Sequence, residues 1–161
     1  PDVRPWFETP YAEQWPELSP DEQWMAYGSN ASGRNEVWVR PYPGPGGEAV
    51  QVSIDGGSSP AWNPRGGNEL FFLTPRDAAG KASMLVVEIS GGRPIGRPTT
   101  VFKFDGSSLH FFCSPVRCYD VSADGQRFYV TQRRPAPPRP PVTHIDLILN
   151  WVDEVKARVR K

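Results

Sequence analysis

Histidine and cysteine are scarce in this chain of 161 residues, which contains two of each. A hydrolytic triad needs a nucleophile, a histidine base and an acid that orients it. Neither His110 nor His144 lies in a supporting motif, and Gly28–Gly33 lacks the Gly-x-Ser-x-Gly spacing of a nucleophile elbow. We therefore predict that the chain has no catalytic residue and is not an enzyme, and we expect His144 to be structural.

Spacings typical of metal and cofactor sites are also missing. The two cysteines and two histidines lack the close paired spacing of zinc ligands, although His110, Cys113 and Cys118 could converge by chance. The turns at Asp55 and Asp105 lack the further carboxylates of a calcium loop. No glycine-rich loop is followed by Lys and Ser or Thr, as phosphate binding would require. The prediction is therefore no metal ion and no cofactor.

The chain has no excess charge and no long apolar run. Eighteen Lys and Arg residues balance eighteen Asp and Glu residues, so net charge does not favour nucleic acid as a partner. No stretch approaches the roughly 20 apolar residues of a membrane helix, so we expect no membrane insertion. Residues 1–4 lack the apolar core of a signal peptide. A longer parent chain could carry an upstream signal, which leaves the compartment open.

Proline, glycine and aromatic residues are plentiful by contrast. The chain has 19 Pro and 15 Gly, which mark turns, and six Trp, eight Phe and five Tyr, which suit the faces of packed sheets. This composition predicts an all-β fold of short strands joined by tight turns.

Three stretches of the chain follow one pattern: Leu18–Tyr27, Trp62–Phe72 and Val121–Val130. Each runs from a short apolar strand end through a Ser/Asn-Pro/Ala-Asp/Arg turn into an aromatic-rich strand. The copies recur about every 45 to 60 residues, a period typical of propeller blades. The repeat predicts a β-propeller built from blades of four antiparallel strands, with about three blades in this chain.

The first copy and its continuation, Leu18–Pro43, resemble the WD40-like, TolB-like (PD40) propeller repeat. The chain resembles the C-terminal blades of bacterial propeller domains, including those attached to some serine/threonine kinases, in which a strand like Ile145–Trp151 closes the chain. The resemblance covers residues 5–152 and departs from the pattern at Arg65 and at the two cysteines. It implies a binding module and favours a periplasmic or extracytoplasmic location, in a domain spanning residues 1–152 with a short helix or tail at 153–161.

Turn signals divide the blades into strands. We expect the first blade at Pro16–Leu18, Trp24–Gly28, Glu36–Pro41 and Ala49–Val52. The second should comprise Ser59–Trp62, Glu69–Thr74, Ser83–Ile89 and Thr99–Phe102, and the third Tyr119–Val121, Phe128–Gln132 and His144–Leu149. The polyproline stretch Pro135–Pro141 should be a stiff loop tip in the third blade. The alternative interpretation is a ligand for a proline-binding module.

The third blade lacks a fourth strand, and Arg4–Thr9 is predicted to be a spare strand, placed where the outer strand of a preceding blade would lie. Three blades alone do not close a propeller, which has about four or more. Two solutions are open: a homodimer that closes a six-bladed ring with two-fold symmetry, or further blades in a longer chain.

The segment Phe104–Arg117 interrupts the repeat between the second and third blades. Such a connection crosses one face of a propeller near its channel, so His110, Phe111, Phe112 and Arg117 are our candidate residues for binding a ligand or partner. Alternatively, the phenylalanines plug the junction between blades. Cys113 and Cys118 could form a disulfide or remain buried thiols.

The leading functional hypothesis is a non-enzymatic propeller that binds or senses a protein, peptide or small ligand. One alternative is an accessory propeller in a longer hydrolase or kinase polypeptide. Another is a carbohydrate-binding or carbohydrate-processing propeller, in which Trp15, Trp24, Trp38 and Trp62 would be stacking platforms rather than filler between blades.

Overall fold

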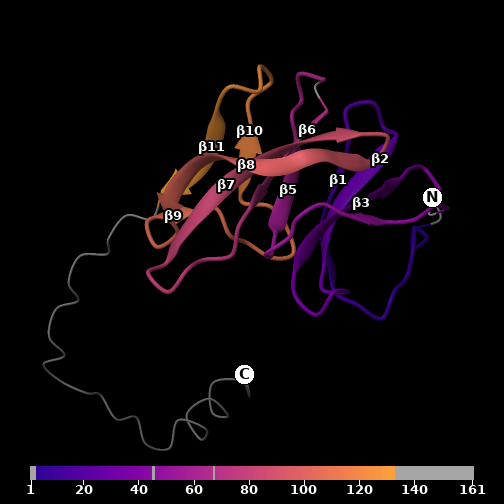
Figure 1. Ribbon diagram of the computed structural model, residues 1–161, viewed down its shortest axis with the longest axis horizontal. Helices are drawn as coiled ribbons and strands as arrows, with labels where there is room; N and C mark the ends of the chain where they lie inside the picture. Colours follow the sequence, from indigo (N-terminus) through magenta and orange to yellow (C-terminus); the bar gives the residue numbers. More distant parts are fainter. Residues whose placement is uncertain (1–2, 45, 67, 133–161) are drawn as a thin grey trace, which may run out of the picture.

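A computed structural model describes residues 3–44, 46–66 and 68–132 of the chain. Within these residues the regular structure consists of β-strands, arranged in three antiparallel sheets of four, four and three strands (Figure 1). None of the described residues form a helix long and apolar enough to span a membrane. The prediction of all-β propeller blades is confirmed.

The first two sheets are complete four-stranded blades, in which consecutive strands pair in chain order. Blade 1 contains β1 (Glu13–Leu18), β2 (Trp24–Ser29), β3 (Glu36–Pro41) and β4 (Val50–Gln51). Blade 2 contains β5 (Ser58–Trp62), β6 (Glu69–Leu73), β7 (Lys81–Ser90) and β8 (Arg93–Asp105). Each of the eight strands overlaps its predicted range, and β1, β7 and β8 extend furthest beyond theirs.

The third sheet contains β10 (Tyr119–Val121), β11 (Phe128–Gln132) and β9 (Leu109–His110), in the spatial order β10-β11-β9. Strands β10 and β11 match the prediction, whereas β9 was not predicted. It pairs with the end of β11, with His110 opposite Thr131. The predicted strand His144–Leu149, the loop Pro135–Pro141 and the tail 153–161 lie outside the described residues.

Side chains of the repeat build the turn that follows each innermost strand. In blade 1, Ser19 Oγ donates to Asp21 Oδ1 over 2.5 Å and accepts the backbone N–H of Trp24 at 2.9 Å. In blade 3, Ser122 and Asp124 repeat this arrangement over 2.5 Å. These bonds explain the recurrence of Ser-x-Asp, because the two side chains satisfy backbone groups of a tight turn.

Blade 2 forms the same turn with different residues. Asn63 stands in the serine position, and its Oδ1 accepts the backbone N–H of Arg65 at 3.1 Å. Its Nδ2 donates to Glu69 Oε2 over 2.7 Å. The amide of Asn63 therefore stabilises the turn without an aspartate, which explains why the repeat tolerates Arg65.

The core lies between neighbouring blades. One buried cluster joins blades 1 and 2 and contains Ala26, Val37, Val39, Val52, Trp62, Leu70, Phe72, Val87 and Ile89. A second joins blades 2 and 3 and contains Ala61, Phe71, Leu73, Ala82, Met84, Phe104, Phe111, Tyr119 and Val121. Side chains alternate between the two faces of a strand, so blade 2 supplies both clusters: Leu70 and Phe72 face blade 1, and Phe71 and Leu73 face blade 3.

The prediction of a spare strand at Arg4–Thr9 is wrong, because these residues adopt no strand conformation in the structure. Their aromatic rings pack on blade 1 instead. The Phe7 ring lies 5.4 Å from that of Tyr27, and the Arg40 guanidinium lies 4.6 Å from the centre of the Phe7 ring. Among the described residues no strand pairs with this segment, and these side-chain contacts hold it on blade 1.

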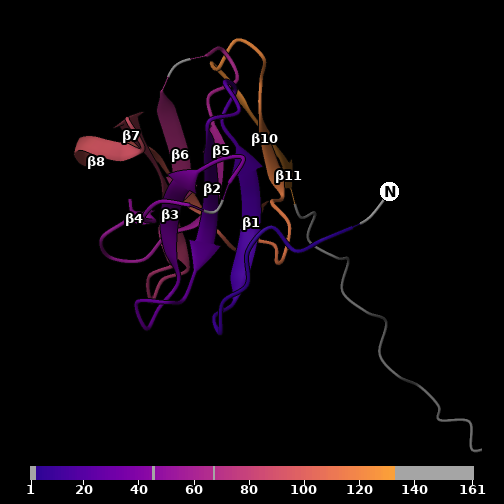
Figure 2. The ribbon, with the colours of Figure 1, turned by 90° about the vertical axis from the view of Figure 1, so that its right-hand side faces the viewer.

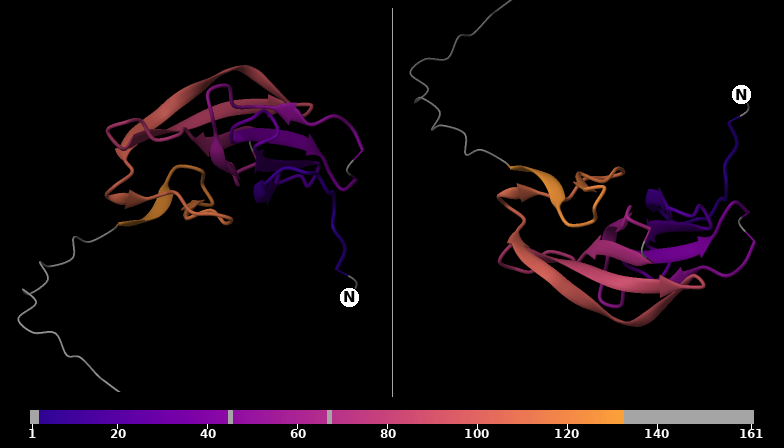
Figure 3. Two further views of the ribbon diagram at one scale, coloured as in Figure 1. Left: turned by 90° about the horizontal axis from the view of Figure 1, so that it is seen from below. Right: turned by 90° about the horizontal axis from the view of Figure 1, so that it is seen from above.

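The three sheets follow one another around an arc rather than a closed ring (Figure 3). Blade 2 forms the middle of the arc, and the orange segment with β10 and β11 turns back toward β1. Figure 2 shows the same approach from the side, with β1 close to that segment. The concave side of the arc is therefore lined by the innermost strands and by the connection between blades 2 and 3.

Candidate functional site

Two of the innermost strands contain the same irregularity, which faces the concave side. Strand β1 is bulged between Gln14 and Glu17, and β5 between Ser58 and Ala61. At each bulge the residue before a proline has a positive φ, 53° at Trp15 and 51° at Ser59. Bulges of this kind release backbone groups from the ladder and so leave them available to other segments.

The freed backbone groups bind the connection between blades 2 and 3. The N–H of Trp15 donates to Pro115 O over 3.1 Å. The carbonyl of Ser59 accepts the Tyr119 hydroxyl at 2.7 Å, and that of Pro60 accepts Arg117 Nη1 at 3.0 Å. The bulges thus fix the connection across the concave side.

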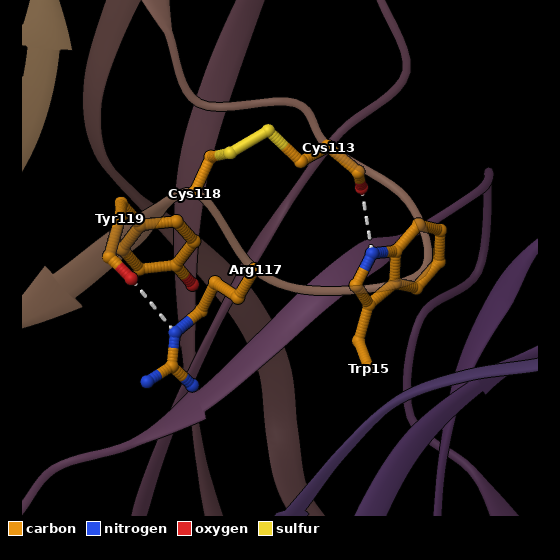
Figure 4. Close-up of a disulfide and its surroundings, with 5 residues drawn as sticks. All are labelled: Trp15, Cys113, Arg117, Cys118 and Tyr119. Carbon is orange, nitrogen blue, oxygen red and sulfur yellow. Dashed lines mark hydrogen bonds between the residues drawn. A yellow bond between two sulfur atoms is a disulfide. The ribbon is translucent and has the colours of Figure 1, made fainter.

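A disulfide between Cys113 and Cys118 closes part of this connection into a small loop, with the two Cα atoms 5.5 Å apart (Figure 4). We call residues 113–118 the disulfide loop. Trp15 Nε1 donates to the carbonyl of Cys113 over 2.7 Å. Ser114 Oγ donates to Gln14 Oε1 over 2.5 Å. Both contacts join the loop to β1, about 100 residues earlier in the chain.

Arg117 is the most extensively bonded side chain of the loop. Its Nη1 lies 2.7 Å from Glu17 Oε2, and its Nη2 lies 3.3 Å from Asp120 Oδ1. Its Nε donates to Tyr119 O over 2.9 Å (Figure 4). Burial by itself lowers the pKa of Arg117, but the hydrogen bond and charge of Glu17, together with Tyr119 and Asp120, outweigh it, and the pKa lies above its usual value. The guanidinium is therefore a permanent cation that connects blade 3 to β1.

Tyr119 is fully enclosed behind this network. Burial raises its pKa far above 10.0, the ordinary value, and the nearby Arg117 lowers it only in part. The phenol is consequently neutral, and its single donor is used by Ser59 O. We assign Tyr119 a structural role.

A cavity of about 650 Å³ opens on one side of the disulfide loop, and we call it the channel cavity. Its lining residues come from β1, β5, the loop and blade 3: Trp15, Pro16, Glu17, Pro60, Pro115, Val116, Arg117, Cys118, Tyr119, Asp120, Tyr129, Val130 and Thr131. Val116 is 64% exposed and Tyr129 is 58% exposed. Large apolar side chains therefore stand in solvent beside the Glu17, Arg117 and Asp120 charges.

A second cavity of about 590 Å³, the rim cavity, involves the other end of the disulfide loop and the tips of blades 1 and 2. Its lining comprises Trp15, Asn35, Gly57, Ser58, Pro75, Arg76, Phe112, Cys113 and Ser114. The Arg76 guanidinium lies 4.4 Å from the centre of the Phe112 ring. This cation–π contact fixes the position of Phe112 at the cavity wall.

The structure does not bring the four predicted binding residues into one cavity. Arg117 lines the channel cavity, Phe112 lines the rim cavity, and His110 lines a smaller cavity of about 250 Å³. Phe111 is only 1% exposed and lies 4.3 Å from the Phe104 ring, in the core between blades 2 and 3. It cannot be an exposed anchor, and that prediction is corrected: Phe111 plugs the junction between blades.

The sequence analysis did not identify four residues that shape the two cavities. Glu17 and Arg76 hold Arg117 and Phe112 in place, and Val116 and Tyr129 supply the exposed apolar surface. The sequence feature that could have indicated this site is the Trp-Pro pair at 15–16 and the Ser-Pro pair at 59–60, because each pair lies at a bulge on the concave side. Trp62 is buried between blades 1 and 2, where it serves as filler rather than as a sugar-stacking platform.

Comparisons with known proteins support the fold. No protein-family model matches the chain, and no match was found among curated proteins. Among solved structures, a TolB-type protein from Agrobacterium tumefaciens superposes with a TM-score of 0.54 at 20% identity, over 76% of this chain and 43% of that one. TolB from Acinetobacter baumannii superposes with a TM-score of 0.53 at 18% identity, over 77% of this chain and 27% of that one.

A weaker likeness, with a TM-score of 0.44 at 18% identity, involves a puromycin-hydrolysing peptidase of Mycobacterium tuberculosis, over 59% of this chain and 17% of that one. The two TolB superpositions show that the chain has the fold of TolB-like β-propeller blades, as its repeats predicted, and it spans less than half of either TolB structure. At this level of identity the likeness establishes the fold alone.

Proposed function

We propose that this chain is a non-enzymatic β-propeller module that binds a protein or peptide segment in the channel cavity. The observation that carries the proposal is the exposure of Val116 and Tyr129 on the wall of a cavity held rigid by a disulfide and the Arg117 network. A rigid wall with exposed apolar anchors and a polar surround is typical of protein recognition sites, because little entropy is lost on binding.

The charges of the cavity indicate the chemistry of the ligand. Glu17 and Asp120 contribute two negative charges and Arg117 one positive charge, so these three residues leave a formal charge of −1. Asp120 is the more accessible carboxylate, with a side chain 74% exposed. We infer a ligand segment that combines an apolar side chain, for the Val116 and Tyr129 surface, with a basic side chain near Asp120.

We also propose that the arc is completed by partner blades, from a second copy of this chain or from further blades in a longer one. The number of sheets supports this, because the described residues form three, and a closed propeller has about four or more blades. A solution mass of twice 18.0 kDa would support the two-fold six-bladed ring, and a stable mass of 18.0 kDa would exclude it for this chain. The disulfide supports an extracytoplasmic location, where such bonds persist.

A peptide-display selection tests the binding proposal. Immobilised protein is screened against a random peptide library, and dissociation constants of the selected peptides are measured for the wild type, Val116→Asp, Tyr129→Ala and the control Val101→Asp. Val101 is an exposed valine on β8, outside the channel cavity. We expect Val116→Asp and Tyr129→Ala to weaken binding about tenfold or more, and Val101→Asp to leave it unchanged. Failure to select peptides, or equal binding by all variants, would contradict the proposal.

A further inference from the structure

Three metal-ligating side chains converge beside the disulfide loop. The ligand atoms of His110, Cys113 and Cys118 all lie within 4.8 Å of one another, and all three residues are partly buried. Within the described residues, no fourth histidine, cysteine or carboxylate joins this group. In the oxidised state the two sulfurs are bonded to each other, so they cannot act as thiolate ligands.

The backbone at each of the three residues is held by contacts other than the disulfide. His110 is paired with Thr131 in the third sheet. The carbonyl of Cys113 accepts Trp15 Nε1, and Cys118 lies between Arg117 and Tyr119, which both bind the carbonyls of β5. Breaking the sulfur–sulfur bond would therefore leave the three side chains close together.

The dimensions and donor types suit zinc. Two thiolates and one imidazole on a tetrahedral Zn²⁺, with Zn–S of about 2.3 Å and Zn–N of about 2.0 Å, lie about 3.5 to 3.8 Å from each other. The observed cluster is within 4.8 Å, and the Cys113 and Cys118 Cα atoms are 5.5 Å apart. Side-chain rotation alone can therefore separate the sulfurs to the distance that a shared metal ion requires.

We propose that reduction of the Cys113–Cys118 disulfide converts this cluster into a zinc site, with His110 as the third protein ligand and a fourth position open to water. A dithiol or phosphine reductant supplies two electrons, the sulfur–sulfur bond breaks, and each sulfur takes up one proton. Binding of Zn²⁺ then releases the two thiol protons and forms two Zn–S bonds and one Zn–N bond. The oxidised and the metal-bound forms are mutually exclusive.

Cobalt titration of the reduced protein tests the proposal, because Co²⁺ bound to thiolates has characteristic charge-transfer and tetrahedral d–d absorption. The full chain is reduced with a phosphine, desalted under nitrogen and titrated with Co²⁺, after which Zn²⁺ is added. We expect one equivalent of Co²⁺ to bind with thiolate absorption, Zn²⁺ to displace it, and the affinity to rise with pH. The oxidised protein should show none of this absorption.

Variants identify the ligands. His110→Ala, Cys113→Ser and Cys118→Ser should each weaken metal binding by about a hundredfold or more, since each removes one of three ligands. Ser114→Ala is the matched control, because Ser114 lies in the loop but outside the cluster, and it should bind as the wild type does. Circular dichroism of oxidised His110→Ala and of the reduced wild type checks that both remain folded.

Several results would overturn the proposal. Reduced protein that binds Co²⁺ no more tightly than oxidised protein would do so, as would full affinity in folded His110→Ala. A stoichiometry of one metal ion per two chains would assign the site to an interface instead. Loss of the folded spectrum on reduction would contradict the premise that the backbone holds the cluster together.

Discussion

Arg117 and Glu17, one hundred positions apart in the chain, form an ion pair of 2.7 Å across the concave side of the arc. The side chain of Arg117 is 17% exposed and that of Glu17 is 30% exposed, so solvent screens the pair only in part. The same guanidinium binds Pro60 O and Tyr119 O. One side chain thereby connects the innermost strands of all three blades.

Removal of the Arg117 guanidinium should destabilise the protein. We expect Arg117→Ala to lower the free energy of unfolding by about 2 kcal/mol, because Glu17 and two carbonyls lose their partner, while the partial exposure keeps the loss below that of a fully buried pair. Urea denaturation measures the change. Arg127→Ala is the control, because its pair with Asp124 is exposed, and the expected change is within about 0.5 kcal/mol. Equal effects of the two variants would refute the proposed role of Arg117.

The disulfide should contribute modestly to stability, because it closes a short loop. For a sequence separation of five residues, the chain-entropy estimate is about 2 kcal/mol. Thermal unfolding of the wild type with and without reductant, compared with Cys113→Ser/Cys118→Ser, measures it. The double variant should match the reduced wild type and should not respond to reductant. The double variant contains no cysteine, so a change in its thermal unfolding on addition of reductant would contradict the assignment of the stability difference to the disulfide.

Phe111 and Phe112 should differ in their contributions to folding. Phe111→Ala removes a ring from the core and should lower the free energy of unfolding by about 3 to 5 kcal/mol. Phe112→Ala removes a half-buried ring from the rim cavity together with its contact to Arg76, and about 1 kcal/mol is expected. Denaturant unfolding of both variants is the test. A large loss of unfolding free energy in Phe112→Ala and a small one in Phe111→Ala would contradict the placement of Phe111 in the core and Phe112 at the cavity wall.

Stability should decline in alkaline solution through Tyr119. Its pKa is raised in the folded protein, chiefly by burial, so the unfolded chain loses this proton first. The contribution is therefore fully present below pH 10 and is lost as pH rises above that value, at up to about 1.4 kcal/mol per pH unit. Tyr119→Phe should show a shallower decline than the wild type between pH 10 and 11. An equally steep decline in Tyr119→Phe and in the wild type would contradict this contribution of Tyr119.

The sequence was sufficient to predict the blades, because their signals are local. Alternating apolar residues and Ser-Pro-Asp or Asn-Pro turns located eight strands of blades 1 and 2 to within a few residues at most ends. Even the departure at Arg65 left the prediction intact, since Asn63 bonds the backbone of the turn.

The candidate site was harder to predict, because it depends on how the blades come together. The contact of Arg117 with Glu17 joins distant segments, and neither residue type nor spacing indicates it. The orientation of Phe111 follows from the short strand β9, which has no strong pattern of its own. Arg4–Thr9 has the composition of a strand, but strand formation also requires a paired neighbour, and no strand within residues 3–44, 46–66 and 68–132 pairs with it.

The most direct test of the channel cavity as the binding site is nuclear magnetic resonance mapping of a selected peptide on ¹⁵N-labelled protein. We expect the largest chemical-shift changes at Val116, Asp120, Tyr129 and Thr131, around the channel cavity. Changes concentrated at Arg76 and Phe112 would place binding in the rim cavity and contradict the proposed binding site.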